Sequence, residues 1–146
     1  MAIDLDQIDI VAGDMDATLA FYRRLGVQIP EEAIWRTATG IHHVDITMPS
    51  GLIVHFDSQR LAASYNTGWQ APDRTRSGNV LSFKVAERDE VDELHRVLTD
   101  LGHPSSQAPY DPFWGSRFAI VDDPDGNHIG IMSAADPTRR GLPPDL

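Results

Sequence analysis

Hydrophobic and polar residues alternate through IDLDQIDIVA (residues 3–12), as they do on a β-strand with one buried face. The next segment, GDMDATLAFYRRLG (residues 13–26), repeats its apolar residues at helical spacing. Asp14 is a good N-cap at its start, and Gly26 at its end is a residue that commonly stops helices. The pattern therefore predicts a strand followed by a helix.

The same order of elements returns about 75 residues further along, a spacing that fits a duplicated module. NVLSFKVA (residues 79–86) alternates as a strand, and residues 87–102 have a helical pattern that ends at Gly102. We predict that the apolar stripe of this second helix consists of Val91, Leu94, Leu98 and Leu101.

Two alternating segments follow each predicted helix, and each pair is joined by turn-forming residues. IHHVDITM and LIVHFD flank residues 49–51, and RFAIVDD and NHIGIMS flank residues 124–126. A stretch before each hairpin has room for one more short strand. The predicted fold class is α+β, with two β-α-β-β-β modules whose mixed sheets are cupped around a cleft. We expect the modules at residues 1–57 and 79–133, a linker at 58–78 and a flexible tail at 134–146.

Composition narrows the class of protein. The chain has 146 residues, of which 41% are hydrophobic, enough for a packed core. Its formal net charge of −10 argues against nucleic acid as a partner, because no basic patch is available to displace counterions. No apolar run is long enough for a membrane helix, and the N-terminus does not resemble a signal peptide. The lack of cysteine fits a cytoplasmic protein.

The last predicted strand, NHIGIMS, places His128 and Gly130 on the face away from its helix. A glycine inside a strand often marks the close approach of a ligand or of another backbone. We therefore expect both residues to line the cleft.

Three aromatic residues lie close together in PYDPFWG, namely Tyr110, Phe113 and Trp114. Aromatic rings on a loop favour burial or a binding partner. They either stack on a planar ligand or pack at the rim of the module or at an interface between chains.

Other candidate ligand contacts are single residues. Trp35 either covers an edge of the core or lines the cleft. His43 is expected to face inward, whereas the adjacent His42 must point to the opposite face of the same strand. Arg117 offers a polar or cation–π contact, or else forms a structural salt bridge. A metal site made of Gln7, His43 and His128 is an unusual further alternative.

The duplicated pattern, together with GDMDATLAFYRRLG and with DDPDGN before the last strand, resembles the vicinal-oxygen-chelate superfamily. This family includes glyoxalase I, extradiol dioxygenases and drug-binding proteins of the bleomycin-resistance type. The resemblance covers about residues 4–133 and implies a homodimer with sites between paired modules; domain swapping is left open. WQAP and PYDPFWGSRFAIVDDPDGN are similar to the mitomycin-resistance type, whose members lack a metal and hold a flat drug against aromatic side chains.

The metal enzymes of this family place His, Glu or Gln at four inward strand positions. Matched to this sequence, these positions fall on Gln7, Val54, Val80 and Gly130, with His55 replacing Val54 if the hairpin register differs by one residue. Three of the four matched residues have no ligand atom, and even an open catalytic site needs about three protein ligands. The resemblance therefore implies no metal or other cofactor; if a metal binds, Gln7 and His55 are its ligands.

We interpret the sequence as that of a metal-free binding protein that sequesters a planar aromatic or quinone-like compound, as in antibiotic resistance. The predicted ligand contacts are Trp35, His43, Tyr110, Phe113, Trp114, Arg117, His128 and Gly130. No catalytic residue is assigned. The alternative is a glyoxalase- or dioxygenase-like metal-dependent lyase, isomerase or oxidoreductase with an atypical ligand set.

Overall fold

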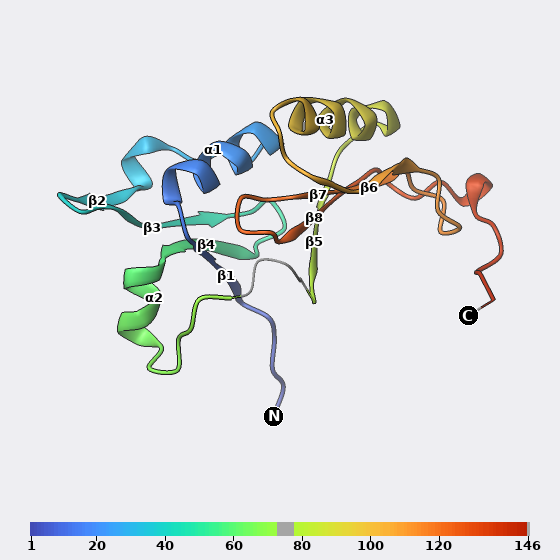
Figure 1. Cartoon of the computed structure of the whole chain (residues 1–146). Helices are drawn as coiled ribbons and strands as arrows, with labels where there is room; N and C mark the ends of the chain where they lie inside the picture. Colours follow the sequence, from blue (N-terminus) through green and yellow to red (C-terminus); the bar gives the residue numbers. More distant parts are fainter. Residues whose placement is uncertain (73–77, 146) are drawn as a thin grey trace. The chain divides into compact units, whose positions relative to one another are not determined.

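The computed structural model describes residues 1–72 and 78–145. The chain divides into two compact units, Met1–Asp73 and Arg74–Leu146, here called the N-terminal and C-terminal units. Each unit has one four-stranded mixed sheet and one long helix over that sheet (Figure 1). The α+β class with two β-α-β-β-β repeats is confirmed, and the predicted bounds of the modules stay a prediction. The cleft and the homodimer stay predictions.

The N-terminal unit begins with a strand and a helix and continues with a three-stranded meander. Its elements are β1 (Gln7–Ala12), α1 (Met15–Leu25), a 3₁₀-helix (Glu31–Ala33), β2 (Trp35–Thr37), β3 (Gly40–Thr47), β4 (Ile53–Ser58) and α2 (Gln59–Tyr65). The strand order is β1-β4-β3-β2, with β1 parallel to β4 and the other pairs antiparallel.

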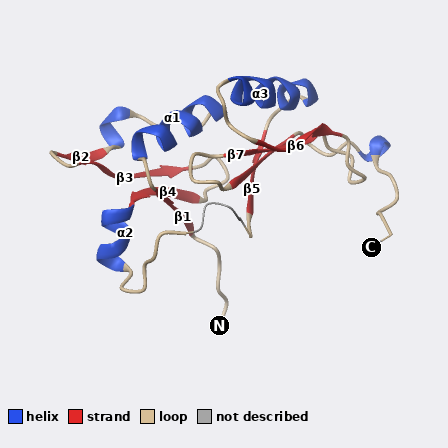
Figure 2. Cartoon of the chain, in the orientation of Figure 1, coloured by secondary structure: helices blue, strands red, loops and turns tan. Residues whose placement is uncertain are grey.

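The C-terminal unit repeats this order of elements without a counterpart of α2 in its described part (Figure 2). Its elements are β5 (Val80–Lys84), α3 (Arg88–Asp100), β6 (Ser105–Tyr110), β7 (Phe118–Asp122), β8 (His128–Met132) and a 3₁₀-helix (Pro137–Arg139). The strand order is β5-β8-β7-β6, and β5 runs parallel to β8. None of the described helices is long and apolar enough to cross a membrane.

The helix ends follow the local sequence signals. The Asp14 carboxylate accepts a hydrogen bond from the Ala17 N–H at 3.0 Å, and Gly26 ends α1 with φ of +115°. A capping box between Glu87 and Glu90 starts α3. The prediction for Leu101 was wrong: α3 ends one residue earlier, so this side chain leaves the apolar stripe and is 56% exposed.

Each core lies between the long helix and one face of the sheet. In the N-terminal unit, the rings of Tyr22 and Phe56 are fully buried with centroids 4.6 Å apart, and Phe21 meets Tyr22 edge-on. In the C-terminal unit, the fully buried side chains are Val91, Leu98, Ala119, Val121, Ile129 and Ile131. The opposite face of each sheet is therefore free to carry a site.

Two segments have more structure than the sequence pattern indicated. The segment interpreted as a linker contains α2, whose N-cap Ser58 accepts a hydrogen bond from the Leu61 N–H at 3.2 Å. The tail, predicted to be flexible, is tied to a loop at two points. Asp136 donates its backbone N–H to the Gly115 carbonyl, and Gly141 donates to the Phe113 carbonyl at 2.8 Å.

Candidate functional site

The free face of the N-terminal sheet is polar. Strand register pairs Asp9 with His55 across β1 and β4, and pairs His43 with Asp57 across β3 and β4. Because side chains alternate along a strand, every second residue of these three strands points to the same face. That face carries Gln7, Asp9, His43, Asp45, His55 and Asp57.

A pocket of about 320 Å³ opens on this face. The sheet supplies most of its lining, and α2 adds Leu61 and Tyr65 at one end. The full lining is Gln7, Asp9, His43, His55, Asp57, Leu61 and Tyr65. Among these residues there is no lysine or arginine, so the pocket favours positive or hydrogen-bond-donating groups.

A chain of hydrogen bonds fixes His43 inside the pocket. Its Nδ1 lies 2.6 Å from Asp57 Oδ1, and the Tyr65 hydroxyl donates to Asp57 Oδ2 at 2.7 Å. The Asp57 side chain is 3% exposed. Burial of the phenol, with the hydrogen bond to Asp57, raises the pKa of Tyr65, so the hydroxyl stays protonated and donates. Both carboxylate oxygens of Asp57 are therefore engaged, Oδ2 by the Tyr65 hydroxyl and Oδ1 by His43 Nδ1.

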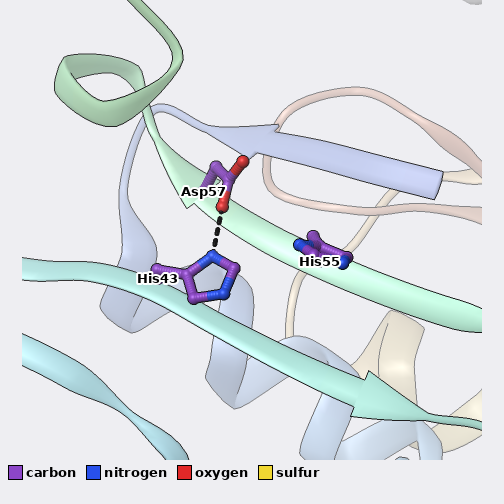
Figure 3. Close-up of side chains that lie close together, drawn as sticks. All are labelled: His43, His55 and Asp57. Carbon is purple, nitrogen blue, oxygen red and sulfur yellow. Dashed lines mark hydrogen bonds and ion pairs between the residues drawn. The ribbon is translucent and has the colours of Figure 1, made fainter. Parts of the chain in front are cut away.

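His55 lies beside this pair on the same strand as Asp57 (Figure 3). Its ring centroid is 5.1 Å from that of His43, and its Nδ1 is 3.7 Å from Asp9 Oδ1. Gln7 in turn donates to Asp9 at 3.1 Å. One ligand atom each from His43, His55 and Asp57 lie within 4.8 Å of one another. Two imidazoles and a carboxylate are donors that first-row divalent metals accept.

The register of the hairpin decides which residue matches the family's second ligand position. Val54 points into the core and is 6% exposed, whereas His55 points into the pocket. The match of the second ligand position to Val54 was wrong by one residue. The alternative match, His55, is the residue on the polar face.

The residues at the family's four metal positions do not fit its metal site. Val80 and Gly130 have no side-chain donor. The space over Gly130 is also filled, because a Cβ there would collide with the Ser82 hydroxyl and lie 3.0 Å from Phe118 Cε2. The side chains of Ser82 and Phe118 thus occupy the place that a Cβ at Gly130 would take. The sequence had led us to expect an open gap at this position.

The free face of the C-terminal sheet carries a group of aromatic rings at one end. Phe118 and Gly130 lie on this face, and the rings of Tyr110, Trp114 and Phe113 continue from it. Neighbouring centroids are 5.4 to 6.5 Å apart and the rings meet edge-on. Tyr110 is 39% exposed and Phe113 is 42% exposed. These four rings, here called the aromatic cluster, form an accessible apolar surface beside Gly130.

The remaining predicted contacts are distributed over both units. Trp35 in the N-terminal unit is half exposed and packs on His42, with centroids 5.2 Å apart. His128 in the C-terminal unit is held by Asp122, with Nδ1 2.9 Å from Oδ1, and by the Ser106 hydroxyl. Of the predicted contacts, the structure gathers Tyr110, Phe113 and Trp114 in the aromatic cluster and places His43 in the polar pocket.

Arg117 is occupied by structural contacts. Its guanidinium donates two hydrogen bonds to Asp92 on α3, at 2.6 and 2.8 Å, and reaches Asp111 at 3.3 Å. Arg88 also pairs with Asp111. Of the two roles considered for Arg117, the structure therefore shows the structural salt bridge. This salt bridge joins α3 to the start of β7.

The Asp92–Arg117 pair makes stability depend on pH. The hydrogen bond from Arg117 lowers the pKa of Asp92. The pair's contribution to folding stability is therefore present above the unfolded pKa of about 3.9, and it is lost as the pH falls through the lowered folded pKa. We expect Asp92→Asn to reduce the urea midpoint at pH 7, and the difference from the wild type to shrink as the pH is lowered through the acid range. Asp100→Asn, which removes an exposed pair on the same helix, is the control. A difference that persists unchanged at pH 2 would contradict this assignment.

Sequence reasoning missed Asp57 and Tyr65. The available signal was the alternation of His43 with Asp45 and of His55 with Asp57 on two strands joined by one turn, which places all four side chains on one face. Tyr65 could not be placed, because the helix that carries it was interpreted as linker.

Comparisons with known proteins agree with this architecture. Residues 4–131 match the sequence model of the Glyoxalase/Bleomycin resistance protein/Dioxygenase superfamily. No curated protein matches the chain. Among solved structures, a glyoxalase-related enzyme from Fulvimarina pelagi is similar at a TM-score of 0.71 and 20% identity, covering 90% of this chain and 88% of that one.

Two further solved structures are similar to the same extent. A hypothetical protein from S. aureus has a TM-score of 0.69 at 20% identity, with 92% of this chain and 95% of that chain covered. A lactoylglutathione lyase from Agrobacterium tumefaciens has a TM-score of 0.60 at 20% identity, with 90% and 93% covered. At this level of identity the likeness establishes the shared fold.

Proposed function

The chain belongs to the glyoxalase/bleomycin resistance protein/dioxygenase superfamily, and from that premise we propose that it binds a planar aromatic or quinone-like small molecule by ring stacking. In this proposal the protein does not use the family's four-ligand metal, because two of those positions are Val80 and Gly130. Binding alone would lower the free concentration of a toxic compound, as in antibiotic resistance, and no chemical step is required.

The aromatic cluster is the observation that carries the proposal. Four rings meet on the free face of the C-terminal sheet, and two of them keep about two fifths of their surface exposed. Burial of such rings against a flat ligand removes apolar surface from water, and ring–ring contact adds about 0.5–1.5 kcal/mol for each pair. Two such contacts plus area burial are sufficient for a dissociation constant in the micromolar range.

The proposal includes a homodimer in the cytoplasm, in line with the resemblance to dimeric relatives and with the absence of cysteine. In a homodimer, a second chain would compete with the ligand for the exposed rings.

Fluorescence of Trp114 alone tests the proposal. The chain has three tryptophans, so Trp35→Phe combined with Trp69→Phe leaves Trp114 as the sole emitter. We expect saturable quenching by at least one compound in a panel of anthraquinones, naphthoquinones and phenazines. Phe113→Ala in this background should weaken binding about 3–10-fold, because it removes one ring contact.

A matched variant retains Trp35 alone, through Trp69→Phe and Trp114→Phe, and reports whether Trp35 also senses the ligand. The proposal fails if no panel compound quenches Trp114 saturably. It also fails if Phe113→Ala leaves every affinity unchanged but dissociates a dimer in light scattering, because the cluster would then be an interface between chains.

A metal-dependent lyase, isomerase or oxidoreductase with an atypical ligand set is the second candidate. One observation favours it, namely the proximity of His43, His55 and Asp57 in the polar pocket. Activity lost on treatment with a chelator and restored by a divalent metal would support this candidate over ligand sequestration.

A further inference from the structure

We propose that the polar pocket of the N-terminal unit binds a divalent transition-metal cation through His43, His55 and Asp57. The site lies on β3 and β4 within one unit, and only His55 in its ligand set coincides with one of the family's four positions. It goes beyond the proposed binding of an aromatic ligand and stands independently of it. It also departs from the expectation of a metal-free protein, which was formed before Asp57 was placed beside the two histidines.

The geometry of the three side chains is close to what a metal requires. Ligand atoms about 2.1 Å from a Zn²⁺ ion at tetrahedral angles are roughly 3.4 Å apart. Here the three atoms lie within 4.8 Å of one another, and His43 Nδ1 is 2.6 Å from Asp57 Oδ1. Side-chain rotations that move these atoms by about 1 Å would therefore bring all three to bonding distance of one metal ion. Figure 3 shows both imidazoles on the same side of the sheet as the carboxylate.

Asp57 is already oriented for this role. Tyr65 holds Oδ2, so Oδ1 points toward His43. A cation between His43 Nδ1 and Asp57 Oδ1 would take the place of the hydrogen bond that now joins them, with the imidazole N–H on Nε2. Tyr65 acts as a positioning residue, because it sets the direction of the carboxylate without reaching the cation itself.

The charges around the pocket favour a cation. Asp9 Oδ1 lies 3.7 Å from His55 Nδ1, and Asp45 Oδ1 lies 3.6 Å from His43 Nε2. The described lining contains no lysine or arginine, so no side chain with a fixed positive charge there pairs with these carboxylates. The negative potential at the pocket attracts a divalent ion and is strengthened by the net charge of −10.

The donor types select the kind of metal. Two imidazole nitrogens with one carboxylate suit Zn²⁺, Co²⁺, Ni²⁺, Fe²⁺ or Mn²⁺, whereas Ca²⁺ and Mg²⁺ prefer oxygen ligands alone. Three protein ligands leave at least one coordination position open to the pocket. A water molecule or an oxygen of a small ligand would complete the coordination there.

Titration of the full chain with Co²⁺ tests the site. After treatment with a chelator, the tag-free protein is titrated while visible d–d absorption is recorded. We expect saturation at one Co²⁺ per chain with a dissociation constant in the micromolar range or tighter. His43→Ala and His55→Ala should each weaken binding at least about 30-fold, and Tyr65→Phe should weaken it about 10-fold.

His42→Ala is the matched control, because His42 is the next residue on the same strand but faces Thr37 and Ser58 on the other side. It should bind Co²⁺ like the wild type. The proposal is overturned if the wild type shows no saturable absorption up to 1 mM Co²⁺, a result that needs no variant to fold. It is also overturned if folded His43→Ala and His55→Ala proteins bind as the wild type does. Quenching of Trp114 by aromatic compounds is a separate readout, so failure of one proposal leaves the other testable.

Discussion

Phe56→Ala is expected to lower the free energy of unfolding by about 3–5 kcal/mol. Phe56 is fully buried on β4, where its ring lies 4.6 Å from that of Tyr22 on α1. Removal of the ring leaves a cavity between the helix and the sheet that the neighbours fill only in part. Urea denaturation followed by circular dichroism measures the change.

The same substitution should also weaken Co²⁺ binding, because Phe56 lies between His55 and Asp57 on one strand and fixes their direction from the opposite face. Phe56→Leu, which keeps most of the volume, should cost less than about 1.5 kcal/mol. Trp35→Ala, at a half-exposed ring, should change stability by about 0.5 kcal/mol or less. A loss below about 1 kcal/mol for Phe56→Ala would show that β4 is not anchored as described.

Gly130→Ala is expected to cost about 1–3 kcal/mol even though alanine is small and the site lies in a strand. The new methyl group would collide with the Ser82 hydroxyl and lie 3.0 Å from Phe118. Gly130→Glu, which restores a carboxylate at the family's fourth ligand position, should be at least as destabilising and should not raise the number of Co²⁺ ions bound.

A double-mutant cycle isolates the steric cause. Ser82→Gly removes the nearest side chain, so Gly130→Ala in that background should cost at least 1 kcal/mol less than in the wild type. Equal costs in the two backgrounds would mean that Ser82 does not fill the space over Gly130. The family's metal position would then be open in this protein after all.

The order of elements could be predicted from the sequence because its signals are local. Asp14 and Gly26 mark the ends of α1, and alternation in each hairpin identifies β3, β4, β7 and β8. Membership of the glyoxalase/bleomycin resistance protein/dioxygenase superfamily was predicted in the same way and is confirmed. The sequence left open whether Val54 or His55 faces away from the core, since a register shift of one residue exchanges the two faces of a strand.

The polar pocket was not predicted because it depends on the register between two strands and on a helix outside the predicted modules. Asp57 belongs to the last strand of the first module, and only the register with β3 brings it to His43. Tyr65 reaches Asp57 from α2. This helix was not predicted, because it lies in a segment rich in turn-forming residues. The filling of the space over Gly130 likewise depends on the rotamers of Ser82 and Phe118, which no sequence periodicity specifies.

The most direct test of the proposed function is a titration followed through the indole N–H signals of the three tryptophans in ¹⁵N-labelled protein. A compound that quenches Trp114 is added in steps while all three signals are recorded. Our account predicts that the Trp114 signal shifts saturably at micromolar concentration. Saturable shifts confined to Trp35 or Trp69 would contradict it, because the ligand would then bind away from the aromatic cluster.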